Sequence, residues 1–386
     1  MSLNRRLKIG IVAGEASGDV LGAGLIKSLK QLHPNCDVVG VGGDHLLEQG
    51  VKSLIDINEL SVMGLVEVLK HLPRLLAIRK QILAYFLANP PDVFVGVDAP
   101  DFNLPLAKIL KAKGIKTVHY VSPTVWAWRE SRIHKIAKAT NLVLGIFPFE
   151  QAIYEQYQVP YQYVGHTLAD EIALDVDQDA ARQSFDLSPQ EHVLAILPGS
   201  RRKEISVMLP VFLQTASLYQ GHKSPLKVII PAANRARYEQ IEQILDELKP
   251  DFSVVLTREP ARQVMIAANG VLLTSGTASL EAMLCKRPMV VAYKMSALTY
   301  KIMQRLYKPK YFSLPNIMAN YALVPELLQE EVNAANLCQH LLSQVEGNQD
   351  VLLQAYKEQH LRLKQDADSQ AAQAVLALIN NEPTKQ

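Results

Sequence analysis

Short apolar runs of strand length alternate with segments of helical periodicity along almost all of this 386-residue chain. A strand that is followed by a helix and then by another strand predicts a parallel sheet with crossover helices. The alternation pauses at the acidic stretch 175–179 and then begins again, so the pattern predicts two such sheets. The first series of predicted strands covers 7–13, 37–41, 92–97, 117–121 and 142–146, and the second covers 192–197, 227–231, 253–256, 271–274 and 289–293.

The two series predict an α/β protein with two doubly wound, Rossmann-like domains whose carboxyl-terminal strand edges face a central cleft. The length suits two domains, since single cores rarely grow beyond ~300 residues. We place the domains at 1–172 and 173–359, and we expect the last helices, within 360–386, to pack back on the first domain. The acidic stretch is better interpreted as a linker with an N-cap than as a calcium loop, because Ala180 stands where the turn glycine belongs.

The composition argues against several classes of function. The 40 basic and 38 acidic residues give a formal net charge of +2, so nothing indicates a nucleic-acid partner. The three cysteines lack metal-site or disulfide spacing and fit a reducing compartment. The apolar run 9–13 is too short for a signal peptide, and the uncharged stretch 264–280 is too polar for a membrane span. We expect a cytoplasmic protein, or one bound only to a membrane surface.

Polar residues follow two predicted strands of the first domain. After the first strand, Glu15, Ser17 and Asp19 stand in a tight glycine-containing turn that opens a helix, which indicates a polar ligand; plain turn formation is the alternative. Asp98 ends the strand 92–97, where an α/β sheet presents residues to its crevice. A carboxylate there can deprotonate a hydroxyl nucleophile, whereas Asp98 or Asp101 could instead only cap the next helix.

Both tryptophans of the chain fall in one loop of the first domain. Ser122, Trp126, Trp128 and Arg129 follow the predicted strand 117–121. Exposed indole rings beside an arginine suit a sugar face or an acyl chain. A packing cluster in a core or an interface is an equally good interpretation of the same residues.

A turn with the composition of an anion site follows the first strand of the second domain. Gly199, Ser200 and Arg201 combine a flexible backbone with a guanidinium at the start of a helix, and a surface turn is the alternative. A weaker turn signal ends at Asn316, where no function is indicated by the residues alone.

The most informative turn of the second domain follows the strand 271–274. Ser275, Gly276 and Thr277 open a helix whose backbone amides can hold a pyrophosphate. Glu281 lies about one turn inside this helix and can accept hydrogen bonds from both ribose hydroxyls. The alternative is that Ser279 and Glu281 only cap the helix.

The segment 61–87 carries an apolar stripe at helical spacing, with basic residues on the opposite side. Such a segment could lie in a membrane interface, and the same stripe would serve equally well as a core face. Pro73 argues against one straight helix and favours a second helix that begins there. The stripe consists of Leu65, Val68, Leu69, Leu72, Leu75 and Leu76.

Taken together, these segments resemble the lipid-A-disaccharide synthases, which are glycosyltransferases of family 19 with the GT-B fold. The resemblance extends over essentially the whole chain, with its parts in the same order. It is carried by GEASGD at 14–19, VMGLVEVL at 62–69, VFVGVDAPDFN at 93–103, HYVSPTVWAWR at 119–129, LPGSR at 197–201, SGTASLEAML at 275–284 and SLPN at 313–316. The segment SGTASLE alone would indicate only the wider GT-B class.

The resemblance implies an inverting hexosyltransferase of lipid A and lipopolysaccharide biosynthesis that uses no metal and no other cofactor. The donor would be UDP-2,3-diacylglucosamine and the acceptor 2,3-diacylglucosamine 1-phosphate. The products would be the β-1,6-linked disaccharide 1-phosphate and UDP. Carried over by position, Asp98 would be the base for the acceptor 6-hydroxyl and Arg201 would neutralise the leaving diphosphate. The donor site would also include Gly199, Ser200, Ser275, Gly276, Thr277, Glu281 and Asn316.

The resemblance also implies a division of labour between the domains. The second domain would bind the UDP-sugar, and the first would face the membrane and the acceptor, with a polar loop formed by Glu15, Ser17, Asp19, Ser122, Trp126 and Trp128. The protein would lie on the inner face of the inner membrane, and whether it forms a homodimer stays open. The membrane contact would be made by Val66, Val68, Leu69, Leu72, Leu75 and Leu76.

Two other functions stay open at this point. A UDP-N-acetylglucosamine 2-epimerase would share the two-domain fold, but it would need neither the apolar stripe nor the Trp126–Trp128 cluster. A non-catalytic nucleotide-sugar sensor is the other alternative, against which a carboxylate at a strand end argues.

Overall fold

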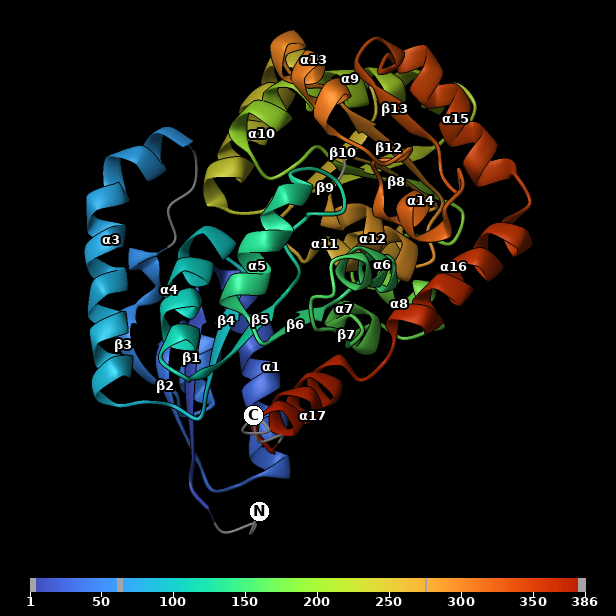
Figure 1. The fold of residues 1–386 in the computed structure, drawn as a ribbon. Coiled ribbons are helices and arrows are strands. Elements are labelled where there is room, and N and C mark those ends of the chain that lie inside the picture. The colour runs from blue at the N-terminus through green and yellow to red at the C-terminus, as the bar shows by residue number, and fades with distance from the viewer. Residues whose placement is uncertain (1–4, 61–64, 275, 381–386) are drawn as a thin grey trace. The chain divides into compact units, whose positions relative to one another are not determined.

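The computed structural model describes the chain apart from residues 1–4, 61–64, 275 and 381–386. The chain divides into two compact units (Figure 1). Unit 1 consists of Met1–Asp170 and Leu363–Gln386, and unit 2 consists of Glu171–Arg362. The chain therefore leaves unit 1 once and returns to it with its last helix.

Unit 1 is built on a seven-stranded sheet in which all neighbouring strands run parallel. The strand order is β3-β2-β1-β4-β5-β6-β7. The order reverses between β1 and β4, which makes this a doubly wound sheet with a topological switch point at that pair. The strands are β1 (Leu7–Ala13), β2 (Cys36–Gly42), β3 (Lys52–Asp56), β4 (Val93–Val97), β5 (Lys116–Tyr120), β6 (Leu142–Gly145) and β7 (Tyr161–Tyr163).

Helices cover both faces of this sheet, because its central strands are apolar on both sides. On one face, Leu25 of α1 and Val375 of α17 pack in one cluster with Ile9, and α1 and α17 lie side by side (Figure 1). On the other face, Phe86 of α3 packs with Phe94 of β4. The helices are α1 (Ala16–Leu32), α2 (Asp44–Glu48), α3 (Leu65–Ala88), α4 (Pro100–Ala112), α5 (Ile133–Ala139), α6 (Gln151–Gln156), α7 (Thr167–Glu171) and α17 (Ala367–Asn380).

Unit 2 is built on a six-stranded parallel sheet with the order β10-β9-β8-β11-β12-β13, again with a switch point, here between β8 and β11. Phe212 of α9 and Leu341 of α15 belong to the core cluster on one face. The strands are β8 (His192–Leu197), β9 (Leu226–Pro231), β10 (Ser253–Thr257), β11 (Gly270–Thr274), β12 (Met289–Tyr293) and β13 (Glu326–Leu328). The helices are α8 (Gln178–Gln183), α9 (Arg202–Gln220), α10 (Arg235–Leu248), α11 (Ala261–Ala267), α12 (Thr277–Leu284), α13 (Ala297–Leu306), α14 (Leu314–Ala319), α15 (Ala334–Glu346) and α16 (Gln349–Leu363).

The predicted fold class is confirmed, and all ten predicted strands are present. Three strands were missed, namely β3, β7 and β13. Each is short and lies at an edge of its sheet with few buried residues, so its apolar signal is weak. The predicted N-cap in the acidic stretch is confirmed, because the Asp177 side chain accepts a hydrogen bond from the backbone N–H of Ala180 at 2.9 Å. The expected second helix at Pro73 is wrong, since α3 continues through this residue.

Candidate active site

The turn from β8 into α9 depends on a glycine and a glutamate. Gly199 has φ +109°, and a Cβ there would lie 2.6 Å from the Oε2 atom of Glu204, so only glycine fits. Glu204 accepts hydrogen bonds from the backbone N–H of Arg201 at 3.3 Å and from the hydroxyl of Tyr293 at 3.1 Å. The turn is therefore held by a side chain from the first turn of α9 rather than by its own residues.

The guanidinium of Arg201 forms one ion pair within the chain and is otherwise exposed to solvent. Its Nη1 atom donates to the Oε1 atom of Glu204 at 2.9 Å, while its side chain remains 78% exposed. An exposed ion pair of this kind contributes little to stability. The pair instead limits the directions in which the guanidinium can point, and leaves most of its donors free for an anion.

The turn from β11 into α12 uses glycine in a different way. Gly276 is the N-cap of α12 with φ +135°, and a Cβ at this position would meet nothing within 4 Å. The glycine is thus required by the backbone conformation, and the space in front of it is open. Ser279 donates from its hydroxyl to the Gly276 carbonyl at 2.8 Å, which fixes the first turn of α12. Ser275, the third residue predicted here, lies outside the described residues.

These two turns border one cavity of about 520 Å³ at the carboxyl edge of the unit 2 sheet. Burial raises the pKa of Glu281 on its wall, Arg262 opposes the rise, and Glu171 adds to it. The cavity brings together six predicted donor-site residues, namely Gly199, Ser200, Arg201, Gly276, Thr277 and Glu281. It also includes residues that the sequence did not indicate: Pro231, Ala232, Ala233, Arg258 and Glu259. Those follow β9 and β10, and no local motif marked them.

Asn316, which was predicted to complete the donor site, is buried and hydrogen-bonded within the fold of unit 2. It is fully buried in α14, and its amide oxygen accepts from the backbone N–H groups of Leu323 and Val324, both at 2.8 Å. Its amide nitrogen donates to the Val324 carbonyl at 2.9 Å. Asn316 does not line the 520 Å³ cavity. Because these bonds engage both ends of the amide, its observed role is to fold the loop at 323–324.

In unit 1, the turn after β4 is strained. Asp98 and Ala99 have φ values of 50° and 41°, a conformation that costs about 1–2 kcal/mol for each residue other than glycine. The fully buried Asn103 helps to hold the turn, because its amide nitrogen donates to the backbone oxygens of Asp98 at 2.9 Å and Val12 at 3.2 Å. Strain of this kind persists only where surrounding contacts impose it, and it clusters at functional sites.

The strained turn gives Asp98 an unusual carboxylate. Burial raises the pKa of Asp98, partly offset by a hydrogen bond with the backbone of Ala99. The neighbouring turn after β1 is close, since a Cβ on Gly14 would lie 2.4 Å from the Cβ of Ala99. Partial burial, followed by repulsion from Asp98, raises the pKa of the exposed Glu15. Two carboxylates with raised pKa values therefore stand at the carboxyl edge of this sheet, as expected of a proton acceptor and its surroundings.

Asp19 and Ser17, predicted for the same loop, differ from each other. Ser17 is exposed. Asp19 is only 3% exposed, and its carboxylate accepts from the backbone N–H groups of Gly43 at 2.7 Å and His45 at 3.0 Å. Asp19 therefore fixes the start of α2, and its acceptor capacity is used within the fold.

In the loop after β5, the predicted site residues are mostly packed against other side chains, and one N–H donor has no partner among the described residues. Ser122 is buried, and its hydroxyl lies 2.8 Å from that of Tyr154. Trp126 packs edge-on against Phe149, and its buried indole N–H has no hydrogen-bond partner among the described residues. Trp128 is half-buried under the Arg129 guanidinium, which lies 4.2 Å from the ring centroid. The packing interpretation is supported for Trp126, and contact of this loop with a sugar or an acyl chain stays a prediction.

Buried histidine and glutamate residues under this loop were not indicated by the sequence. Burial, aided by Arg132, lowers the pKa of His119 to about 4, and its Nε2 atom has no partner among the described residues. Burial raises the pKa of Glu150 to about 8, although hydrogen bonds from the Phe147 backbone and the Tyr161 hydroxyl oppose this. Only the tertiary fold buries these groups, so no residue pattern could have found them.

The apolar stripe on α3 lies only in part within the residues that the structure describes. The side chains of the predicted contacts Val66, Val68 and Leu69 lie outside the described residues. Leu72 and Leu76 are 42% and 45% exposed. Leu75 is half-buried, and Ile78 and Ile82 on the following turns are buried. The described end of the stripe is therefore not a core face, whereas Ile78, Ile82 and Phe86 further along α3 are buried.

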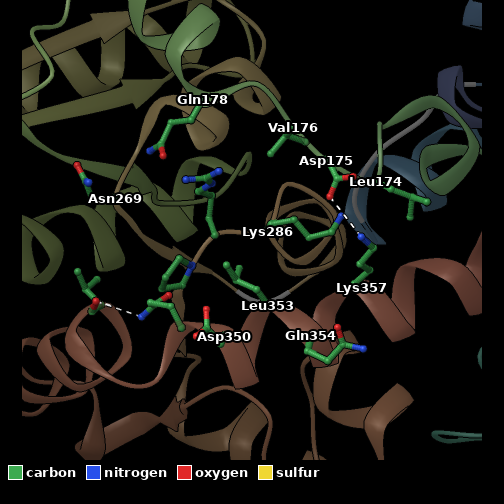
Figure 2. Close-up of a pocket in the computed structure, with 14 residues that line it drawn as sticks. Leu174, Asp175, Val176, Gln178, Asn269, Lys286, Asp350, Leu353, Gln354 and Lys357 are labelled. Carbon is green, nitrogen blue, oxygen red and sulfur yellow. Dashed lines mark hydrogen bonds and ion pairs between the residues drawn. The ribbon is translucent and has the colours of Figure 1, made fainter.

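A larger cavity in unit 2, of about 680 Å³, lies at the opposite edge of the sheet, near the residues that precede β11 and β12. Figure 2 shows Lys286 extending toward the Asp175–Lys357 ion pair, whose charged atoms are 3.5 Å apart. Burial lowers the pKa of Lys286 to about 8, and its Nζ atom lies 2.6 Å from both the Leu284 carbonyl and the His360 ring. This cavity lies away from the strand ends at which α/β sheets bind ligands.

No group of three or more His, Cys, Asp or Glu side chains within residues 5–60, 65–274 and 276–380 is arranged to hold a metal ion. Over the same ranges, none of the helices has the length and the hydropathy that a membrane crossing requires.

Solved structures of sugar-nucleotide enzymes share this architecture. The UDP-GlcNAc 2-epimerase of Methanocaldococcus jannaschii, solved with UDP-GlcNAc and UDP, matches with a TM-score of 0.62 at 12% identity, over 97% of this chain and 100% of that one. CalG4, the calicheamicin glycosyltransferase, matches with a TM-score of 0.61 at 14% identity, over 97% of this chain and 98% of that one. With its two parallel doubly wound sheets, the chain thus has the GT-B architecture of glycosyltransferases and related epimerases.

The sequence comparisons are more specific. The family model described as "Lipid-A-disaccharide synthetase" matches residues 9–379. The lipid-A-disaccharide synthase of Alteromonas mediterranea is 55% identical over 377 residues, which are 97% of this chain and 99% of that protein. That of Pasteurella multocida is 50% identical over 380 residues, 97% of each. The chain belongs to the lipid-A-disaccharide synthase family and is a glycosyltransferase of lipid A biosynthesis.

Proposed function

We propose that the protein transfers 2,3-diacylglucosamine from its UDP derivative to the 6-hydroxyl of 2,3-diacylglucosamine 1-phosphate. The bond between the anomeric carbon and the diphosphate breaks, and its electron pair leaves with UDP. The acceptor oxygen forms the new bond on the opposite face, which inverts the configuration and gives a β-1,6 linkage. The proton of the acceptor hydroxyl passes to Asp98.

The donor half of the proposal is supported by the 520 Å³ cavity. Negative charge grows on the leaving diphosphate as the bond breaks, and fixed donors aimed at that charge lower the barrier. Arg201 supplies a guanidinium, and the turn at Gly276 and Thr277 supplies backbone N–H groups at the start of α12. Glu281, one turn further on, accepts hydrogen bonds from the ribose hydroxyls.

The acceptor half depends on Asp98. Burial raises the pKa of the Asp98 carboxyl, which makes its carboxylate a stronger base than that of an exposed aspartate. The indole N–H of Trp126 is buried and has no hydrogen-bond partner among the described residues, so a ligand oxygen could accept from it only after local rearrangement of this loop. The single observation that carries the proposal is the full-length family match together with this carboxylate at a strand end.

The decisive test is a mass-resolved product. The protein is incubated with the two lipid substrates, and the expected result is one disaccharide 1-phosphate and one UDP for each turnover. A parallel incubation with UDP-N-acetylglucosamine is assayed for the manno epimer. Epimer without disaccharide would replace the proposal with the epimerase alternative, and UDP binding without either product would indicate a sensor.

We also propose that the protein works on the cytoplasmic surface of the inner membrane, contacted through the apolar stripe of α3. Both proposed substrates carry acyl chains, and Leu72 and Leu76 expose apolar surface. The double variant Leu72→Ser and Leu76→Ser is expected to co-sediment with anionic vesicles several-fold less than the wild type while its melting temperature is unchanged. The matched control is Leu218→Ser, an equally exposed leucine on α9. Unfolding of the double variant, or binding equal to that of the control, would contradict the membrane role.

A further inference from the structure

A second cavity of unit 2, of about 450 Å³, shares two wall residues with the donor cavity. Arg201 and Glu204 line both. The shared walls make the second cavity an extension of the proposed diphosphate site rather than a separate feature. Beyond them its walls are mostly aromatic or thioether side chains, among them Met295, Tyr300, Met303, Tyr307, Tyr311 and Phe312.

Apart from Gln304 and Lys310, the charged and amide side chains of this cavity are Arg201 and Glu204, on the wall that it shares with the donor cavity. There the hydroxyl of Tyr293 donates to Glu204, which also holds Arg201. Further in, the hydroxyl of Tyr307 donates to the Tyr311 carbonyl at 2.9 Å, so its polar end is satisfied within the chain and its ring is left as a wall. Charged groups on the shared wall and mostly aromatic or thioether side chains beyond it suit an amphiphile whose charged group binds in the donor cavity.

Helix α13 forms one wall of the cavity and also presents apolar residues to solvent. No residue of α13 is buried. Leu298, Ile302 and Leu306 are 71%, 48% and 49% exposed, and their spacing of four residues places them on one face. Met303 follows Ile302 around the helix, so the exposed apolar face continues into the cavity wall.

Basic side chains on α13 are complementary to the anionic surface of a lipid bilayer, which is where a lipid ligand would come from. Lys301 and Arg305 are exposed on α13, on the side of the apolar face away from Met303. An exposed apolar face bordered by basic residues is the pattern of helices that lie in an anionic bilayer surface. The exposed apolar face of α13 therefore lies next to Met303, which lines the cavity.

We propose that this second cavity binds an acyl chain of the sugar-nucleotide donor while its diphosphate occupies the neighbouring donor cavity. The inference deepens the proposed function and rests on it, since only a lipid donor has a chain to place there. It makes the enzyme selective for acylated donors through ground-state binding. Each methylene buried strengthens binding by about fourfold.

The test compares donors that differ only in acyl-chain length, in wild type and in Met303→Gln, which keeps side-chain length but adds an amide to the wall. In the wild type, KM for the donor is expected to rise about fourfold for each methylene removed. In Met303→Gln, KM for the long-chain donor is expected to rise at least tenfold and its dependence on chain length to flatten, with kcat nearly unchanged. The dissociation constant for UDP, measured by calorimetry, stays the same in both.

Leu218→Gln is the matched control, because it introduces the same amide on an exposed leucine outside the cavity. Circular dichroism melts of both variants show whether they fold. An unchanged chain-length dependence in a folded Met303→Gln variant would overturn the acyl-chain site while leaving the transferase intact. A wild type that binds UDP but makes no disaccharide would overturn the proposed function itself, so the two failures are distinct.

Discussion

Two turns of the same topology, one in each unit, differ in the residues that they place at positive φ. The turn after β4 in unit 1 and the turn after β11 in unit 2 both leave a buried central strand and open a helix. In unit 1 the turn places Asp98 and Ala99 at positive φ, with Asn103 bonded to its backbone. In unit 2 the turn places a glycine, Gly276, at positive φ with open space in front.

Under the proposed function, the difference follows from whether a side chain or the backbone performs the chemistry. A proton acceptor must be a side chain, so unit 1 keeps a carboxylate in the turn and accepts backbone strain. A diphosphate is held by backbone N–H groups, so unit 2 uses the residue that has no side chain and needs none. On this proposal, the same architecture offers a reactive group in one unit and a binding surface in the other.

The largest expected effect is that of Asp98→Asn. Removal of a general base lowers turnover by about 10²–10⁴-fold. The variant is expected to fold, because asparagine tolerates the positive φ at this position. Burial raises the pKa of Asp98, which means that burial disfavours its ionised form, so a neutral amide there should not destabilise the fold. Single-turnover rates and a thermal melt check both parts, and UDP affinity serves as the control. Near-normal turnover would end the assignment of Asp98 as the base.

Arg201→Ala is expected to lower kcat by about 10–100-fold, because a donor aimed at the leaving diphosphate is lost. Arg201→Lys restores the charge but not the forked geometry, so its rate should lie between those of the alanine variant and the wild type. Steady-state kinetics with the lipid donor make the comparison. Equal rates for all three proteins would show that the unit 2 turn binds through its backbone alone.

Gly276→Ala tests whether the backbone of the unit 2 turn contributes to UDP binding. A φ of 135° is a region that side chains other than glycine rarely adopt, and forcing it costs about 1–3 kcal/mol. We expect UDP to bind about tenfold more weakly, measured by calorimetry, while proton transfer is unaffected once the donor saturates the enzyme. The nearby Ala278→Gly, within the same helix, is the control for local stability. An unchanged affinity in Gly276→Ala would remove the turn from the donor site.

The smallest expected effect is a change in pH dependence. Burial raises the pKa of Asp98 above its ordinary value of 3.8, so the group gains its proton, and the enzyme loses its base, at a higher pH than for an exposed aspartate. At saturating donor, kcat should be constant at neutral pH and fall about tenfold per pH unit below the raised pKa. The residual rate of Asp98→Asn should lack this acidic limb. A limb retained in the variant would belong to another group, such as Glu281.

The candidate site was only partly predictable from residue patterns. Six donor-site residues that the sequence indicated line one cavity, because small residues and charges at strand ends leave a local signature. Arg258 and Glu259 come from other strand ends and carry no such signature. Asn316 and Asp19 show that a polar residue in a turn motif can also satisfy backbone groups of the fold, and their part in ligand binding stays a prediction.

By itself the sequence determined the order of strands and helices, the two doubly wound sheets and the family, because these depend on local periodicity and on long ordered motifs. Only the tertiary structure decided which polar groups are buried and which are open. Burial sets the pKa of Asp98, removes Asn316 from the cavity wall and leaves Leu72, Leu76 and the face of α13 exposed. The reason is physical: solvent exclusion depends on segments far apart in the chain, and no local pattern records it.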